Sequence, residues 1–572
     1  MKRTAVLTGL GLALHLGGLS RPVPAASPPG AAVELPPMLV EESTSSAPWY
    51  YAQADGAEFL SRCSASTTRQ FIAAWLAKMQ LVRVLVPGEF LARTDMPTVI
   101  VLYAQDLQQT VSAEIQRELQ GGEGRPGESP RGDRVNIAPN MRLSDRDMHA
   151  SIVYLDEALF DASTLGIAPS HVRFLLAGRS PDLPPWLVEG IERVWHGADF
   201  VLEPITLRPL LWNNQGESDA LANDPARPRA VLPAHDLFAT HAARGAENQH
   251  PRHRETRASA QALFFRWALD SGGAIRDALW KFAARAADGP VTEEIFEASF
   301  GFGFSELRDR LSDYLPKAVG KTAWIDPGRL PPLPRIEVEL ATPNQIARLR
   351  GEWERLAIGH VRRRLPLARE PYIAQARRTL RRAFDAGDRD PRLLATLGLC
   401  EIDADNEGGA RQFLEPAVAL GVGRPRAGHE LARLRFADLR RGVPESKIFS
   451  FTELAPIFDP LRRALTQAPP LPEVFILLAE AWARCELAPN TADLAELETG
   501  ARLFARRPAV GLPLALALAR HGKKAEAAAV LDTSGGYPTD EATQAEITRL
   551  RAELAAALAR PPADEGPVVR RR

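Results

Sequence analysis

A proline-rich stretch at residues 327–334 separates two parts of the chain whose apolar residues follow different patterns. Upstream, β-branched runs lie between segments with helical spacing, which predicts a small sheet with helices. Downstream, segments rich in Ala, Leu and Arg predict helices alone. Because 572 residues exceed what one hydrophobic core usually holds, we expect an α+β domain at 48–320, a linker at 321–340 and an all-α domain at 341–558.

The first domain is expected to contain at least two strands and several helices. The predicted strands are 98–103 and 151–155, and the predicted helices are 71–84, 171–177, 185–195, 257–270, 293–300 and 305–315. The helix at 185–195 starts with proline, which suits a first helical turn because that turn needs no N–H donor. Residues 201–256 have weak periodicity and are expected to be irregular.

The start of the chain has the pattern of a signal peptide. Two basic residues precede an apolar run at 4–19, and small residues and prolines follow it. We therefore expect export to the periplasm or the cell exterior, with residues 1–26 removed, a flexible leader at 27–47 and a disordered tail at 559–572. The apolar run is short and interrupted by glycines, so no membrane span is expected in the mature protein.

The charge balance narrows the choice of partners. Lys+Arg 70 against Asp+Glu 71 leaves a net charge of -1, so the chain lacks the basic excess with which proteins bind nucleic acid or anionic lipid. Three cysteines far apart in the sequence exclude a disulfide framework, although one bridge stays possible.

The second domain shows one period typical of tetratricopeptide repeats, in which paired helices interlock through small and apolar residues. The residues that fit are Leu397, Gly398, Ala410, Leu414 and Ala417, and Leu431-Ala432 recurs 34 residues after Leu397-Gly398. We therefore expect tetratricopeptide-like repeats that offer a concave surface to a protein or peptide partner. A generic helical bundle is the alternative.

Residues 184–195 carry a further pattern, Pro-Pro-Trp-Leu-Val-Glu-Gly-Ile-Glu-Arg-Val-Trp. Together with the segment at 171–176, it resembles the bacterial gluzincin, or peptidase-MA-like, family, which is found fused to tetratricopeptide repeats. Weaker likeness at 259–264 and 296–307 extends the resemblance over roughly residues 48–318. In such peptidases a helical His-Glu-x-x-His supplies two zinc ligands, and the Trp-Leu-x-Glu-Gly glutamate, here Glu189, supplies a third.

The His-Glu-x-x-His motif falls on Pro169, Ser170, His171, Val172 and Arg173. Proline has no ligand atom, the Arg173 guanidinium is permanently cationic, and Ser170 replaces the glutamate that would activate water. Shifting the register around His171 does not restore two imidazoles. The resemblance therefore implies a degenerate zinc site beside Trp186. We expect this site to have no catalytic residues and no cofactor. We also expect Arg173 to pair with Glu189.

Alternatives remain open. Glu189, Glu192 and His196 share one helix face and, with His149, would be the ligands of a displaced zinc site in an active metallopeptidase. If no metal binds there, this face of the helix is solvated, while Trp186 and its apolar neighbours pack inward. The chain is expected to be an exported pseudopeptidase that serves as a scaffold, or the active peptidase, or a cell-envelope interaction protein whose first domain is purely structural.

Overall fold

The computed structural model describes most of the chain from residue 48 onward. The described residues are 48–91, 96–104, 141–162, 165, 169–177, 183–199, 205–210, 212, 231–238, 251–326, 328, 330–364, 369–444, 446–537 and 539–559. The predicted signal peptide, the leader and all but the first residue of the predicted tail lie outside them.

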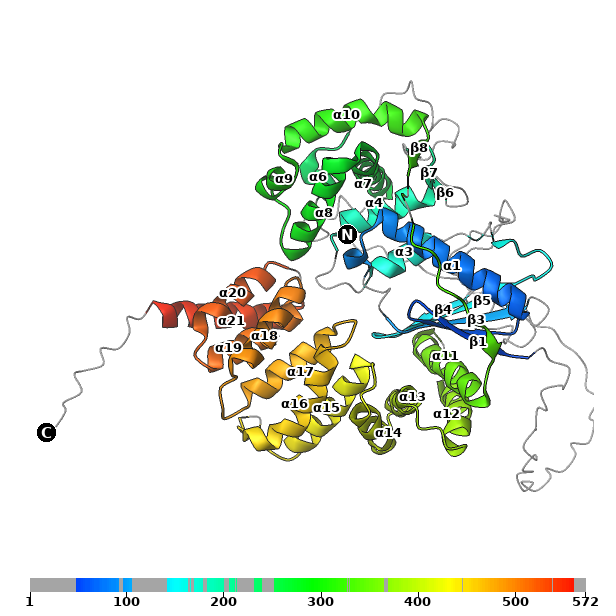
Figure 1. Cartoon of the computed structure of the whole chain (residues 1–572). Helices are drawn as coiled ribbons and strands as arrows, with labels where there is room; N and C mark the ends of the chain where they lie inside the picture. The colour runs from blue at the N-terminus through cyan, green and yellow to red at the C-terminus, as the bar shows by residue number, and fades with distance from the viewer. Residues whose placement is uncertain are drawn as a thin grey trace, which may run out of the picture. The chain divides into compact units, whose positions relative to one another are not determined.

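The first part of the chain contains a six-stranded mixed sheet with the strand order β4-β5-β3-β2-β1-β9 (Figure 1). Its strands are β1 (Tyr50–Ala54), β2 (Ala57–Ser61), β3 (Thr98–Ala104), β4 (Met141–Ser144), β5 (His149–Leu155) and β9 (Glu339–Leu340). β3 runs parallel to both β2 and β5, and the outer pairs are antiparallel. The strands predicted at 98–103 and 151–155 are confirmed, as β3 and β5.

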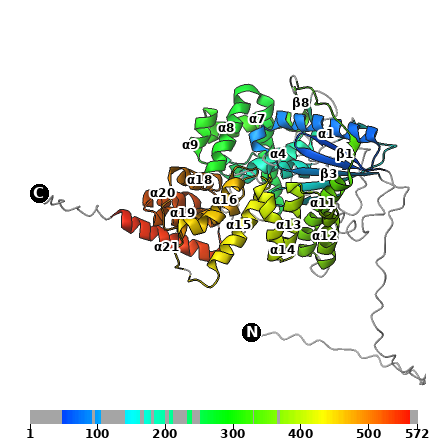
Figure 2. The same ribbon diagram turned by 60° about the horizontal axis from the view of Figure 1, so that its bottom comes forward.

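Helices cover both faces of this sheet. Successive side chains of a strand point to opposite faces, so Phe59 joins a core cluster with residues of α1 (Ala65–Leu85). Its neighbour Leu60 joins another cluster with residues of α11 (Pro343–Arg364). Figures 1 and 2 both show α1 and α11 on opposite sides of the sheet. The first helix of the helical region therefore completes the core of the first part.

The remaining helices of the first part contribute to a core rich in aromatic rings. They are α3 (Pro169–Leu176), α4 (Pro185–His196), α6 (Ala234–Phe238), α7 (Pro251–Ser271), α8 (Gly273–Asp288), α9 (Glu293–Phe300) and α10 (Phe304–Gly320). The Trp186 ring stacks on Phe282 with centroids 5.4 Å apart and meets Phe264 edge-on. The predicted helices are confirmed with somewhat different bounds, while α6 and the start of α7 lie in the segment 201–256, predicted to be irregular.

A second, three-stranded antiparallel sheet consists of β6 (Ala198–Asp199), β7 (Ile205–Leu207) and β8 (Ala323–Ile325). β8 lies within the segment 321–340, where the sequence predicts a linker, and so does β9, which pairs with β1. This segment thus adds a strand to each sheet.

The rest of the chain is helical, which agrees with the predicted α+β class and is compatible with a helical-repeat region. Its helices after α11 are α12 (Arg369–Asp385), α13 (Pro391–Asp403), α14 (Glu407–Ala419), α15 (Pro425–Arg440), α16 (Phe451–Leu465), α17 (Pro472–Ala483), α18 (Thr491–Leu503), α19 (Pro508–Arg520), α20 (Lys524–Ser534) and α21 (Glu541–Leu558). Pairs pack closely, α11 on α12, α13 on α14, α15 on α16 and α19 on α20. Within α13 and α14, a Cβ on Gly398 would lie 2.6 Å from the Leu414 side chain, so glycine permits the close approach. Among the described helices, none is both long and apolar enough to cross a membrane.

Candidate functional site

The pattern at residues 184–195 forms α4 and the residue before it. Pro185 occupies the first turn of the helix, where its missing N–H leaves no hydrogen bond unmade. The apolar residues at most 3% exposed are Trp186 (2%), Leu187 (0%), Ile191 (1%) and Trp195 (3%). The inward packing expected of this face is confirmed, and Glu189 and Glu192 lie on the partly exposed face.

Gly190 lies where α4 packs against α7. A Cβ at this position would lie 2.8 Å from the backbone oxygen of Gln261 and 3.3 Å from the Cβ of Phe265. A helix backbone moves aside less easily than a side chain, so glycine is required for this approach. The glycine of the Trp-Leu-x-Glu-Gly pattern therefore sets how closely α4 approaches α7.

Arg173 on α3 pairs with two glutamates of α4. Its Nη2 donates to Glu189 Oε2 at 3.1 Å, and its Nε donates to Glu192. Burial lowers the pKa of Arg173, but the hydrogen bonds and charges of Glu192 and Glu189 outweigh this effect and raise the pKa above its usual value. The pair predicted between Arg173 and Glu189 is confirmed, and Glu192 is a second acceptor that we did not predict.

The same cluster extends to α7. Arg193 Nε lies 3.4 Å from Glu189 Oε1, and Arg193 Nη2 donates to Glu255. We call Arg173, Glu189, Glu192, Arg193 and Glu255 the arginine–glutamate cluster. Because the Arg173 side chain is 51% exposed and that of Glu189 34%, water screens these pairs, and each contributes at most about 1 kcal/mol to stability. The cluster mainly holds side chains in position, because both carboxylates of α4, Glu189 and Glu192, already have a cationic partner.

The charge of Arg173 is unfavourable for a metal ion beside Glu189. Arg173 holds the one carboxylate that matches the gluzincin pattern, and a guanidinium repels a divalent cation. The side chains of Pro169, Ser170, His171 and His196 lie outside the described part of the structure, which places only their backbone, in α3 and α4. Within the described ranges, no group of three or more His, Cys, Asp or Glu residues is arranged to hold a metal ion.

His149, the fourth residue considered for a displaced zinc site, lies on β5 and is 3% exposed. Its ring centroid lies 4.5 Å from that of Phe174 in an edge contact, and its Nδ1 lies 3.4 Å from Thr98 Oγ1. His149 is therefore a buried residue that packs within the sheet.

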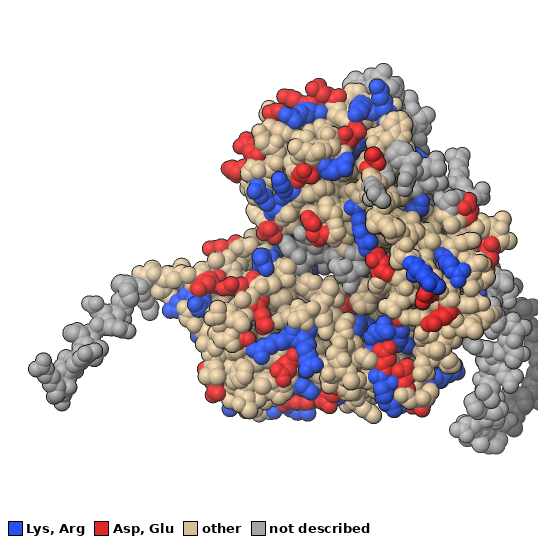
Figure 3. Space-filling view, viewed as in Figure 1, with Lys and Arg blue, Asp and Glu red and all other residues tan. Residues whose placement is uncertain are grey.

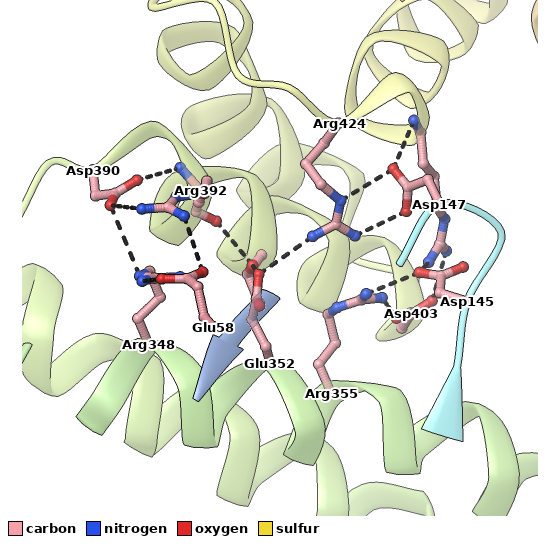
Figure 4. A network of polar contacts seen from close by, with 12 residues as sticks. Glu58, Asp145, Asp147, Arg348, Glu352, Arg355, Asp390, Arg392, Asp403 and Arg424 are labelled. Carbon is pink, nitrogen blue, oxygen red and sulfur yellow. Dashed lines mark hydrogen bonds and ion pairs between the residues drawn. The ribbon is translucent and has the colours of Figure 1, made fainter. Parts of the chain in front are cut away.

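Sequence reasoning missed a second, buried group of charges between the β4–β5 turn and the helical region (Figure 4). Asp147 accepts hydrogen bonds from Arg424 Nη2 at 2.9 Å and Nε at 3.1 Å. It also accepts from the backbone N–H of Arg426 at 3.0 Å, so it caps the first turn of α15 from another part of the chain. The Arg424 and Asp147 side chains are 1% and 0% exposed.

Asp145 lies at the other end of this turn. It accepts from Arg355 Nη2 at 2.8 Å and from Arg426. Burial raises the pKa of Asp145, but the positive charges of Arg355, Arg426 and Arg424 outweigh burial and hold the pKa well below its usual value. Between the two aspartates, Arg146 donates to Glu430 at 3.0 Å and to Glu473 at 3.1 Å.

Glu58 on β2 makes similar contacts with the helical region. It accepts from Arg348 Nη1 and from Arg392 Nη1, each at 2.9 Å, as Figure 4 shows. Burial raises the pKa of Glu58, but the hydrogen bond and charge of Arg348 and the charge of Arg392 hold it below its usual value. We call these residues together the sheet–helix cluster: Glu58, Asp145, Arg146, Asp147, Arg348, Glu352, Arg355, Arg392, Asp403, Arg424, Arg426, Glu430 and Glu473.

Acid is expected to weaken the sheet–helix cluster. The pKa values of Glu58 and Asp145 are lowered in the fold, so the stability they provide is complete above about pH 4 and is lost as the pH falls further. Urea unfolding between pH 7 and pH 3 should show the free energy of unfolding falling below about pH 4. The Asp145→Asn variant should be less stable at pH 7 and lose less on acidification; an equal loss in both proteins would contradict the role of Asp145.

On the face seen in Figure 3, basic and acidic side chains are interspersed, which agrees with a net charge of -1.

No protein-family model matches the chain, and no curated protein is significantly similar to it. Its function is therefore inferred from its residues and their geometry.

Proposed function

We propose that the chain is an exported pseudopeptidase that acts as a scaffold. In this proposal a gluzincin-like body, whose metal position is taken by an arginine, is joined to tetratricopeptide-like repeats that bind a protein or peptide. The observation that carries the proposal is the hydrogen bond of 3.1 Å from Arg173 to Glu189, the carboxylate that the resemblance assigns to zinc. The guanidinium satisfies this carboxylate, so its negative charge is not free to bind a metal.

Hydrolysis by the route of such peptidases needs three protein ligands on zinc, an open position for water and a base to activate that water. Of these groups the chain matches only Glu189, and Ser170 stands where the base would be. The arginine–glutamate cluster instead joins α3, α4 and α7. Its chemistry is that of a structural contact, which supports a body that binds or positions other proteins without cleaving them.

The contacts of the β4–β5 turn exclude one side of the helical region as the binding surface for a partner. Through Arg355, Arg426 and Glu473, the turn reaches α11, α15 and α17, so the side of the repeats that these helices offer to the turn is already filled by the chain itself. In our proposal a protein or peptide partner therefore binds another face of the helical region.

The test of the proposal is the zinc content of the purified full-length protein, together with its action on a mixed peptide library. We expect substoichiometric zinc and intact peptides. Stoichiometric zinc with cleavage that a chelator abolishes would contradict the proposal and favour an active peptidase with displaced ligands.

Restoring the motif should restore metal binding. Positions 169 and 173 are four positions apart on α3, so they lie on one face, and Arg173 already reaches Glu189. The Pro169→His/Arg173→His variant is expected to bind about one zinc per chain, measured by metal analysis after dialysis.

The matched control adds Glu189→Gln to that variant, which removes the third ligand and should abolish most of the zinc binding. Equal zinc content in the two variants would show that residues 169–173 do not stand at the position of the zinc motif.

A further inference from the structure

The segment that joins β8 to β9 is held by a sheet at each end. β8 pairs with β7 in the smaller sheet, and β9 pairs with β1 in the larger one. Between them, residues 331–338 belong to no helix, strand or turn. Gln80 of α1 donates from Nε2 to the backbone oxygen of Pro331 at 3.1 Å, and Figure 1 shows the chain running past α1. We call residues 330–338 the connecting segment.

Prolines restrict the backbone of the connecting segment. It begins with the sequence Leu330-Pro331-Pro332-Leu333-Pro334-Arg335. A proline ring fixes its own φ near the polyproline II value and disfavours a helical conformation of the residue before it. Each residue from 330 to 334 is a proline or directly precedes one. The stretch therefore favours a polyproline II helix, which has about three residues per turn.

Burial along the connecting segment follows this period. Leu330 and Ile336 pack against the core cluster to which α1 contributes, and Leu333, midway between them, is 39% exposed. The other side chains up to position 335 are exposed: Pro331, Pro332, Pro334 and Arg335. Every third side chain thus lies on the protein side, and two ridges of the helix face solvent. One ridge carries Pro331 and Pro334, and the other carries Pro332 and Arg335.

A cation lies at the end of this exposed surface. The Arg335 side chain is 88% exposed, and its Nε lies 3.4 Å from Glu337 Oε1, whose side chain is 77% exposed. Water screens such a pair, so it contributes little to stability. The guanidinium can therefore exchange Glu337 for a carboxylate of another protein.

We propose that the connecting segment is a docking site for a protein domain whose groove is lined by aromatic side chains and ends at a carboxylate. Proline-rich segments dock into aromatic-lined grooves in the polyproline II conformation, which costs little entropy because it is already formed. Both ends of this segment are held by sheets, which lowers the cost further. The two exposed ridges enter the groove, and the carboxylate pairs with Arg335.

This site lies outside the helices that the proposed function assigns to partner binding, and outside the arginine–glutamate cluster. It therefore does not depend on whether the first part is a pseudopeptidase.

The experiment titrates the full-length protein with a set of purified SH3 domains, whose grooves are lined by aromatic side chains, chosen to carry an acidic residue at the end of the groove. Isothermal titration calorimetry measures the binding. We expect at least one domain to bind at one site with a dissociation constant in the micromolar range. If none of the domains bound at about 1 mM, the proposal would be overturned.

Variants locate the site. Pro331→Ala/Pro334→Ala removes both rings of one exposed ridge and should weaken binding about tenfold or more. It keeps the backbone oxygen that accepts from Gln80, so the midpoint of thermal unfolding should stay close to that of the wild type. The control is Pro371→Ala, an exposed proline in the first turn of α12, which should leave the affinity unchanged. Unchanged affinity in the double variant, or equal weakening in Pro371→Ala, would overturn the proposal.

The charge has its own test. Arg335→Gln should weaken binding about threefold to tenfold and make it less sensitive to salt, because the ion pair with the groove is lost. A salt dependence equal to that of the wild type would contradict the assigned carboxylate.

A second copy of the chain is the competing occupant. Sedimentation of the protein alone should be the same for the wild type and for Pro331→Ala/Pro334→Ala. A dimer that this double variant dissociates would assign the connecting segment to self-association and overturn the proposal.

Discussion

Replacement of Arg424 by methionine is expected to lower the free energy of unfolding by about 3–5 kcal/mol. Arg424 makes two hydrogen bonds to Asp147, at 2.9 Å and 3.1 Å, and both side chains are almost completely buried. Methionine fills much of the same volume but removes the guanidinium that faces the buried carboxylate of Asp147, which among the described residues keeps the hydrogen bond from the backbone N–H of Arg426. An uncompensated buried charge is among the most destabilising changes known for a point mutation.

Chemical denaturation of the purified variants measures this effect. The matched control is Arg441→Met, just after the end of α15, where the side chain is 73% exposed and pairs with Asp438 at 2.8 Å; its loss should cost under about 1 kcal/mol. Adding Asp147→Asn to Arg424→Met removes the stranded charge and should recover part of the loss. Similar destabilisation by Arg424→Met and Arg441→Met would show that the buried pair does not form.

Substitution of Gly190 by alanine is expected to destabilise the protein by about 1–3 kcal/mol, the usual cost of overpacking a tight contact. The added Cβ would lie 2.8 Å from the backbone oxygen of Gln261, so α4 and α7 must separate. The separation also shifts Glu189 and Trp186, which lie on α4. A lower midpoint of thermal unfolding, followed by circular dichroism, reports the effect.

Gly359→Ala is the matched control for this substitution. Gly359 is exposed within α11 and a Cβ there would meet nothing within 4 Å. Alanine favours the helix over glycine by about 1 kcal/mol, so this variant should be as stable as the wild type or more stable. If Gly190→Ala behaved like Gly359→Ala, the close approach of α4 to α7 would be refuted.

The sequence predicted those features of the candidate site that depend on local pattern. Proline at the start of α4 and apolar residues at helical spacing were enough to place Trp186 inward and Glu189 on the opposite face. The pair between Arg173 and Glu189 was predicted from the positions that the resemblance to the zinc motif assigns to the two residues. The contact between Arg193 and Glu255 could not be predicted, because α7 begins earlier than its apolar pattern suggests, and its first turns are polar.

The role of α11 was beyond prediction for a different physical reason. Arg348, Glu352 and Arg355 give this helix the composition of a solvated surface, yet each is at most 3% exposed. Their partners lie in other parts of the chain, and ion pairs between distant segments leave no periodic trace in a single sequence. The predicted break at 321–340 follows the change in composition, whereas the tertiary contacts of the sheet continue beyond it.

The long-range pairs of the sheet–helix cluster affect the order in which the chain can fold during synthesis. Glu58 is separated from Arg392 by 334 positions, and Asp147 from Arg424 by 277. Strand β2 and the β4–β5 turn are therefore synthesised long before their partners. Until those partners have been synthesised, the carboxylates of the strand and the turn must stay hydrated, and one apolar face of the sheet stays uncovered. Closing such long loops costs entropy before any contact compensates for it. Folding of the sheet is thus expected to finish only after α15 has been synthesised, and a fragment that ends at residue 320 should not reach a stable fold.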